Sequence, residues 1–244
     1  MTAILAFDLE TMPDVEAGRR LFGFHGTDED VARAMRNRQL TLTNDRTDFL
    51  PPHFHRIVAL GIAGVTLGPE PKVKAEGWAG ESEPSLIFRF MSAIGRRPQL
   101  VSWNGNGFDL PVIRYRALVH NLNTADLDGP SHQKNWESYL YRYGEMHVDL
   151  MDVLSGHGAS PRSNLDDVAR LVGQRGKGGM SGEDVLPLAL AGEWAKIAGY
   201  VKGDAVEVLL LFLRWEVGRG RLQPHVYHAA ENSLNAPAEE LVLS

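Results

Sequence analysis

The stretch AILAFDLET, from Ala3 to Thr11, decides the fold. Its apolar residues predict a buried strand, and this strand ends in two acidic residues, Asp8 and Glu10. Because alternate side chains of a strand share a face, the two carboxylates point the same way, about 6.6 Å apart along the backbone at about 3.3 Å per residue. Two buried like charges are costly unless a cation holds them. The stretch therefore predicts a site for a divalent metal with oxygen ligands.

Composition limits the classes of protein that need consideration. The 244 residues are 43% hydrophobic, which predicts a folded core, and the formal net charge of −6 argues against a surface that coats long duplex nucleic acid. The chain has no cysteine, which excludes disulfides, thiolate zinc sites and thiol catalysis. No basic segment marks a signal peptide, and the longest apolar run, Val208 to Leu213, is far shorter than the ~20 residues of a membrane span. We expect a soluble, cytoplasmic protein.

The hydrophobic pattern predicts an α/β fold, with a mixed sheet and helices on both of its faces. Strands are expected at 3–11, 56–67, 72–78, 99–103 and 146–153, with the second and third joined in a hairpin. Helices are expected at 27–38, 82–94, 110–122, 163–172, 183–191 and 193–217, with Asp109 capping the third and Ser163 capping the fourth. Residues 13–53 and 121–143 read as inserts, and the polar tail 218–244 is expected to be poorly ordered.

Acidic residues outside the first strand extend the predicted site. Asp109 follows the loop NGNGFD directly after a predicted strand, where α/β sheets commonly present functional groups. Tyr200 and Asp204 are four residues apart on the long C-terminal helix and therefore face one spot. Each feature alone has a simpler interpretation, a helix cap for Asp109 and a solvated helix face for the other pair. The combination in this order favours a shared site.

Three segments carry a resemblance to a known family. FDLET at 7–11, NGNGFDLPVI at 104–113 and YVKGD at 200–204 resemble the exonuclease motifs of the DEDD superfamily in its tyrosine-containing (DEDDy) branch. The second motif is most similar to the proofreading domain of family B DNA polymerases. A group of predicted stand-alone 3′–5′ exonucleases resembles that domain, and this chain resembles members of that group. A histidine-type exonuclease would carry His where Gly199 stands, and Val201 replaces a cysteine that is frequent in the family. The chain is too short to hold a polymerase domain as well.

The resemblance implies a ribonuclease H-like (DnaQ-like) fold with a five-stranded sheet, in one exonuclease domain over residues 1–217. It also implies two divalent ions, Mg²⁺ or Mn²⁺, held by four carboxylates. Asp8 would bridge the ions, Glu10 and Asp204 would complete one site, and Asp109 would serve the other. Tyr200 would orient the attacking water, because a phenol with a pKa of about 10 is a poor base at neutral pH.

Four residues are expected to contact the substrate: Leu9, Thr11, Asn104 and Phe108. Asn104 would hydrogen-bond a sugar or phosphate, and Phe108 would either pack near the last bases or belong to the core. Glu10 would also accept a hydrogen bond from the terminal 3′-OH, which explains action from the 3′ end. The expected substrates are the 3′ ends of single-stranded DNA, with short RNA as the alternative. All four carboxylates are present, so a non-catalytic binding module and an unrelated phosphohydrolase are less favoured.

Other features keep two interpretations. The aromatic residues Trp136, Tyr139, Tyr141 and Tyr143 either stack on bases or form a lid that packs on its own domain. Asp149 either supports the metal site or is a structural residue at a strand end, and His55 is expected at the surface or at a strand edge. The glycine-rich segment 174–182 does not have the order of a P-loop, and either contacts the substrate backbone or is a flexible linker.

Overall fold

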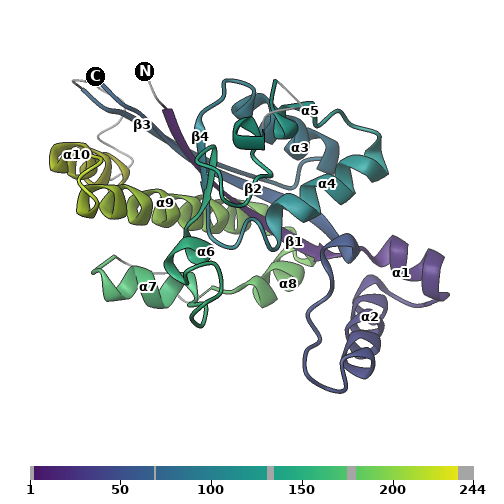
Figure 1. Ribbon diagram of the computed structural model, residues 1–244. Coiled ribbons are helices and arrows are strands. Elements are labelled where there is room, and N and C mark those ends of the chain that lie inside the picture. Colours follow the sequence, from purple (N-terminus) through teal and green to yellow (C-terminus); the bar gives the residue numbers. More distant parts are fainter. Residues whose placement is uncertain (1–2, 69, 131–134, 175–179, 236–244) are drawn as a thin grey trace.

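The computed structural model describes residues 3–68, 70–130, 135–174 and 180–235. Its centre is a five-stranded sheet in the order β3-β2-β1-β4-β5 (Figure 1). The strands are β1 (Ala3–Pro13), β2 (His55–Thr66), β3 (Lys72–Ala79), β4 (Gln99–Ser102) and β5 (His147–Asp149). β2 is antiparallel to both β1 and β3, whereas β4 is parallel to β1 and to β5. The predicted mixed α/β sheet and its hairpin are confirmed.

Helices cover both faces of the sheet. They are α1 (Val15–Phe22), α2 (Asp28–Leu42), α3 (Glu83–Ile94), α4 (Asp109–His120), α5 (Ala125–Asp128), α6 (Leu150–Leu154), α7 (Leu165–Leu171), α8 (Val185–Leu190), α9 (Trp194–Gly218) and α10 (Pro224–Asn235), with 3₁₀ turns η1 (Pro52–Phe54), η2 (Asn135–Glu137) and η3 (Gly182–Asp184). None of those in the described ranges is long and apolar enough to cross a membrane.

The alternation of side chains along β1 divides the core in two. Ile4 and Ala6 point toward α9, where they join an apolar cluster built largely from that helix. Phe7 and Leu9 point to the opposite face and pack with side chains of α3 and α4. Asp8 therefore lies on the α9 face of the sheet, in line with Ala6. Long α9 crosses the sheet on that face in Figure 1.

The first insert folds into two helices instead of the single one expected. α1 and α2 stand at one end of the sheet (Figure 1). Thr27 caps α2, its side chain accepting the Asp30 N–H while the Asp30 carboxylate accepts the Thr27 N–H. At the start of α1, Asp14 accepts a hydrogen bond of 2.5 Å from Arg116 of α4, which also donates to Glu83 of α3. This buried ion network fastens the insert to the helices on the sheet.

Several predicted boundaries are corrected. The last strand ends at Asp149, because the Asp149 side chain accepts the Asp152 N–H and starts α6 there. Asn164 caps α7 in place of Ser163, since its side chain accepts the Asp167 N–H. The cap predicted for Asp109 is also wrong. The N-cap position of α4 is Phe108, which has no polar side-chain atom, and Asp109 lies within the first turn.

The C-terminal segment is ordered farther than expected. Residues from 218 were predicted to form a polar tail, but α10 spans Pro224–Asn235 and packs against α9. Val226, Tyr227 and Ala230 are buried in the cluster of apolar side chains around α9. Their spacing of three to four residues forms an apolar stripe on an otherwise polar helix, which explains both the polar composition and the packing. Residues 236–244 lie outside the described part of the chain.

Candidate active site

Three acidic residues from the two ends of the chain meet on the α9 face of the sheet. Among the described residues, Asp8, Glu10 and Asp204 each place one carboxylate oxygen within 4.8 Å of the others. Glu10 and Asp204 are buried, whereas Asp8 is half-buried. Three like charges this close repel one another, and a divalent cation with carboxylate ligands relieves that repulsion. The donor set thus fits Mg²⁺ or Mn²⁺.

Helix α9 delivers the third acid because it lies directly on the sheet. It crosses β2 and β3 at Gly61 and Gly77, two glycines that are paired in register. The helical turn above them carries Tyr200 and Asp204, which are 9% and 2% exposed. The alternative that these two residues form a solvated helix face is therefore wrong. They face the end of β1 together, as their spacing predicts.

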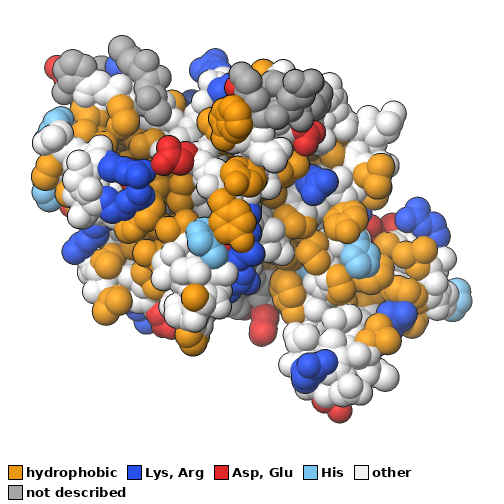
Figure 2. All heavy atoms as spheres, in the orientation of Figure 1, with side chains coloured by type: hydrophobic (Ala, Val, Ile, Leu, Met, Phe, Trp, Pro, Cys, Tyr) orange, Lys and Arg blue, Asp and Glu red, His pale blue; other side chains and the backbone are white. Residues whose placement is uncertain are grey.

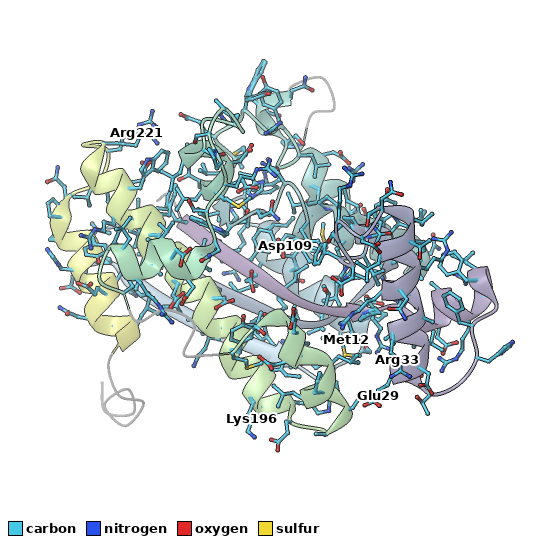
Figure 3. The ribbon with its side chains drawn as sticks, turned by 90° about the horizontal axis from the view of Figure 1, so that it is seen from below. Met12, Glu29, Arg33, Asp109, Lys196 and Arg221 are labelled. Carbon is cyan, nitrogen blue, oxygen red and sulfur yellow. The ribbon has the colours of Figure 1, made fainter. Side chains whose placement is uncertain are left out.

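Asp109 enters the same region from the other side of the sheet but stays outside the group of three. It lies in the first turn of α4 and is only 4% exposed. Figure 3 labels it over the middle of the sheet. The neighbouring Leu110 belongs to the same buried apolar cluster as Leu9, and α4 packs against η1 and β2. A carboxylate at a helix N-terminus also benefits from the partial positive charge of the helix dipole.

The loop that precedes α4 is held in shape by a buried carboxylate. Asp149 accepts the backbone N–H of Asn104 at 2.9 Å and that of Asn106 at 3.0 Å. These bonds hold Asn104 at a positive φ of 66°, a conformation that asparagine tolerates. Burial raises the pKa of Asp149, and the backbone hydrogen bonds oppose that shift. Asp149 therefore shapes the loop that carries Asn104, and its support of the metal site stays a prediction.

Thr11 and Phe108 contact a buried histidine. His55 was expected at the surface or at a strand edge; it is the first residue of β2 but only 7% exposed, and burial lowers its pKa. Its Nε2 lies 3.0 Å from the carbonyl of Leu50, which can only accept, so the neutral ring donates there. Its Nδ1 then accepts from the Thr11 hydroxyl at 2.9 Å. The Phe108 ring packs edge-on against the His55 ring, with 4.9 Å between ring centroids. It also packs at a tilt against the exposed Phe49 ring, with 5.3 Å between centroids.

A cleft of about 730 Å³ opens beside the acid cluster. Its wall includes Asp8, Asn104, Trp103, Arg162 and Arg170. Leu9 is not part of this wall, because its side chain is buried on the opposite face of β1. Asp166 and Asp167 also line it, and Arg170 pairs with Asp166 at 3.0 Å. Acids thus outnumber guanidinium groups on this wall, so an anionic ligand would be held here through a metal ion and Arg162.

Sequence reasoning missed the cations of this region. Asp152 lies at the junction of three segments and accepts hydrogen bonds from Arg142 and Arg162. These three residues are ten positions apart along the chain and match no helix or strand period, so the sequence alone could not predict that they meet. The aromatic segment divides: Tyr139 is fully buried, whereas Trp136 and Tyr143 are exposed. Residues 175–179 of the glycine-rich segment lie outside the described part of the chain.

Comparison with known proteins identifies the family. A model described as a predicted 3′–5′ exonuclease related to the exonuclease domain of PolB matches residues 47–240. The chain belongs to this family. The match includes the motifs at Asn104 and Asp204 but begins after β1, so the roles of Asp8 and Glu10 rest on their motif and on the geometry. Among curated proteins, none matches the chain significantly.

Solved structures place this exonuclease-related family in a known fold. The family B DNA polymerase from the hyperthermophilic archaeon Pyrobaculum calidifontis is similar over 94% of this chain and 27% of its own, with a TM-score of 0.54 and 19% identity. E. coli exonuclease I in complex with a 5cy-dA13 oligonucleotide is similar over 93% of this chain and 42% of its own, with a TM-score of 0.41 and 12% identity. The chain thus spans about a quarter of the polymerase's length. The predicted ribonuclease H-like fold is confirmed.

Proposed function

We propose that this protein is a divalent-metal-dependent 3′–5′ exonuclease that hydrolyses the terminal phosphodiester bonds of single-stranded nucleic acid, DNA in preference to RNA, and releases nucleoside monophosphates. The observation that carries the proposal is the group of Asp8, Glu10 and Asp204, whose carboxylates lie within 4.8 Å beside a cleft. The exonuclease domain is the unit expected over residues 1–217, onto which α10 packs. A cytoplasmic location stays a prediction.

The metal ligands in this proposal are the four acids of the motifs. Asp8, Glu10 and Asp204 would hold the ions directly, and Asp109, which lies outside the group of three, would serve as a further ligand. Two ions, Mg²⁺ or Mn²⁺, supply Lewis-acid charge to the attacking and leaving oxygens of the phosphodiester. Burial of Glu10 and Asp204 supports this assignment, because electrostatic attraction is stronger where water is excluded.

Other side chains bind and orient the substrate. Tyr200, one helical turn from Asp204, hydrogen-bonds the attacking water and directs it at phosphorus. Glu10 accepts a hydrogen bond from the 3′-OH, which selects a strand end over an internal bond. Asn104, on the wall of the cleft, hydrogen-bonds the terminal nucleotide, and Phe108 packs near its base. Leu9 and Thr11 contribute through the backbone of β1, since the Leu9 side chain is in the core and His55 engages the Thr11 hydroxyl.

The test is stepwise shortening of 5′-labelled single-stranded DNA and of the matching RNA, with Mg²⁺, Mn²⁺ or EDTA, resolved on a sequencing gel. We expect a metal-dependent ladder from the 3′ end that forms faster on DNA. Asp8→Asn and Asp204→Asn should abolish it, whereas Glu16→Gln, at an exposed acid on α1, should not. Intact oligonucleotides with every metal, or a ladder that survives Asp8→Asn, would contradict the proposal.

A second readout does not depend on activity. Metal at about 100 times its Kd should stabilise the wild type by about 2.7 kcal/mol, or about 5 to 10 °C in Tm. Asp8→Asn should lose this shift and, in EDTA, should melt higher than the wild type, because one of three repelling charges is gone. The same metal-induced shift in Asp8→Asn would exclude these acids as the ligands.

A further inference from the structure

Exposed rings form a continuous row near the active-site cleft. We call this row the aromatic ridge and define it as Tyr141, Tyr143 and His157. The rings of Tyr141 and Tyr143 lie 6.2 Å apart, and that of His157 lies 5.0 Å from Tyr143. Tyr143 is 62% exposed and Tyr141 39%. Figure 2 shows bulky hydrophobic side chains next to a His and a group of Lys and Arg side chains in the middle of this face.

Two guanidinium groups flank the ridge and share one buried carboxylate. Arg142 donates two hydrogen bonds to Asp152, at 2.6 and 2.7 Å, and Arg162 approaches the same carboxylate at 3.3 Å. Hydrogen bonds from Arg142 hold the pKa of Asp152 below its ordinary range. Two guanidinium groups thus face the Asp152 carboxylate, and the Asp149 carboxyl group lies close enough to interact electrostatically with both Arg142 and Asp152. Both arginine side chains remain 41% to 48% exposed, whereas Asp152 is 3% exposed.

The ridge is joined to the active-site cleft and is firmly anchored. Arg162 belongs both to this cation cluster and to the wall of the cleft that contains Asp8. The segment that carries the two tyrosines is anchored by Tyr139, which is fully buried and donates its hydroxyl proton to the carbonyl of Pro98 at 2.7 Å. Burial of Tyr139 thus positions its neighbours, whose rings stay exposed to solvent, with the Arg142 guanidinium 5.8 Å from the Tyr143 ring.

Exposed aromatic rings beside arginine side chains are suited to binding single-stranded nucleic acid. Single-stranded nucleic acid offers bases that stack on aromatic rings and phosphates that pair with guanidinium groups. The ridge provides the first kind of partner, and Arg142 and Arg162 provide the second. A duplex would hide its base faces from these rings, so the complementarity is to a single strand.

We propose that the single-stranded substrate runs from the cleft over the aromatic ridge on its 5′ side, with bases stacked on Tyr143 and Tyr141 and phosphates bound by Arg162 and Arg142. This inference rests on the proposed function, because it assumes that the 3′ end occupies the cleft beside Asp8. It assigns to the insert 121–143 a role in holding the part of the strand that is not being cleaved.

The test varies substrate length. Tyr143→Ala should raise KM about 5- to 100-fold for a single strand of about 12 nucleotides and leave KM for a dinucleotide unchanged, since a dinucleotide does not reach the ridge. Tyr143→Phe keeps the ring and should behave as wild type. Phe88→Ala removes an aromatic ring of comparable exposure (71%) on α3, which packs on the face of the sheet opposite α9, and should change neither KM. An equal KM increase on both substrates, or none on the longer one, would overturn the proposal.

The cations are tested through salt dependence. Arg162→Gln should reduce the slope of log KM against log salt concentration by about 0.7, the value for one phosphate contact on a single strand. Arg89 lies on α3, has a similar exposure and pairs with Glu81. Arg89→Gln should leave the slope unchanged. Equal slopes for Arg162→Gln and wild type would remove Arg162 from the substrate path.

A binding experiment tests the role of the aromatic ridge independently of the proposed exonuclease activity. Binding of a 5′-fluorescein-labelled oligothymidylate is measured by anisotropy in EDTA, where no hydrolysis takes place. Weaker binding by Tyr143→Ala than by wild type supports the ridge even if no ladder forms on the gel. Equal Kd values overturn it even if the wild type degrades DNA.

Discussion

Gly61 of β2 lies directly under the carbonyl oxygen of Val201 on α9, and a Cβ built on Gly61 would come within 2.0 Å of that oxygen. Gly77 on the next strand repeats the relationship, because its Cβ would lie 2.1 Å from the carbonyl oxygen of Ala198. The obstructing atoms are backbone and cannot rotate away. Only glycine at both positions allows α9 to approach the sheet closely enough to bring Asp204 to the acid cluster.

Gly61→Ala should therefore damage stability and metal binding together. Pushing α9 from the sheet should cost about 1 to 3 kcal/mol of unfolding free energy, the usual range for overpacking, measured by urea denaturation in EDTA. The metal-induced Tm shift should shrink as Asp204 moves away. Gly199→Ala is the matched control: a Cβ there meets open space, so the variant should gain about 0.5 to 1 kcal/mol. An unchanged metal shift in Gly61→Ala would contradict this account.

Tyr200→Phe should lower kcat about 10- to 100-fold, because the attacking water loses the group that orients it. The metal-induced Tm shift should be retained, since the phenol is not a metal ligand in the proposal. Tyr227→Phe on α10 removes a hydroxyl that is bonded to Glu231, far along the chain from the motifs, and should leave kcat unchanged. Loss of the metal shift in Tyr200→Phe would reassign the tyrosine to a structural role.

Asp149→Ala should loosen the loop that presents Asn104. The N–H groups of Asn104 and Asn106 would lose their acceptor, and each such loss costs about 1 to 3 kcal/mol when the donor stays buried. We expect lower stability in urea and a higher KM, with the metal-induced Tm shift retained. If that shift disappears while the loop keeps its stability, Asp149 supports the metal ligands instead.

His147 should make the fold sensitive to acid. It is 1% exposed, and burial lowers its pKa to about 4, from an ordinary value of about 6.5. The unfolded chain therefore takes up the proton first, so this contribution to stability is complete above about pH 6.5 and is lost as the pH falls toward 4. Between these values we expect a loss of about 1.4 kcal/mol per pH unit. Burial lowers the pKa of His55 as well and acts in the same direction.

Urea denaturation at several pH values between 7.5 and 4.5 checks this prediction. His147→Gln should show a flatter dependence of unfolding free energy on pH, because it removes the group that titrates. His228→Gln, at a histidine that is 65% exposed, should follow the wild type. Identical slopes for His147→Gln and the wild type would show that another group controls acid stability.

Most of the framework was predictable because its signals are local. Alternation and β-branched residues identified β1 and the β2–β3 hairpin, and the apolar spacing over 82–94 identified α3. Three of the four predicted metal ligands also converge, because Asp8 and Glu10 share a strand face and Asp204 lies on the helix that covers it. The family's motif order carried this information, since no spacing rule links residues so distant in the chain.

What could not be predicted depends on tertiary contacts. Tyr139 and Tyr143 belong to one polar, aromatic segment, yet the first is fully buried and the second is exposed, because only the first reaches the carbonyl of Pro98. α10 was missed because its short apolar stripe is weak until α9 supplies the matching surface. Asp109 was wrongly predicted to cap α4 because aspartate is common at N-caps. The N-cap of α4 is Phe108.

The two strongest contributors to the site, β1 and α9, are also the first strand and the longest helix near the other end of the chain. During synthesis Asp8 leaves the ribosome well before Asp204. Contacts between residues so far apart close large loops and form late in folding. Under the proposed function, a nascent or truncated chain that lacks α9 has no complete active site. Nuclease activity then depends on the docking of α9 on β1, so it follows the fraction of molecules in which this long-range contact has formed.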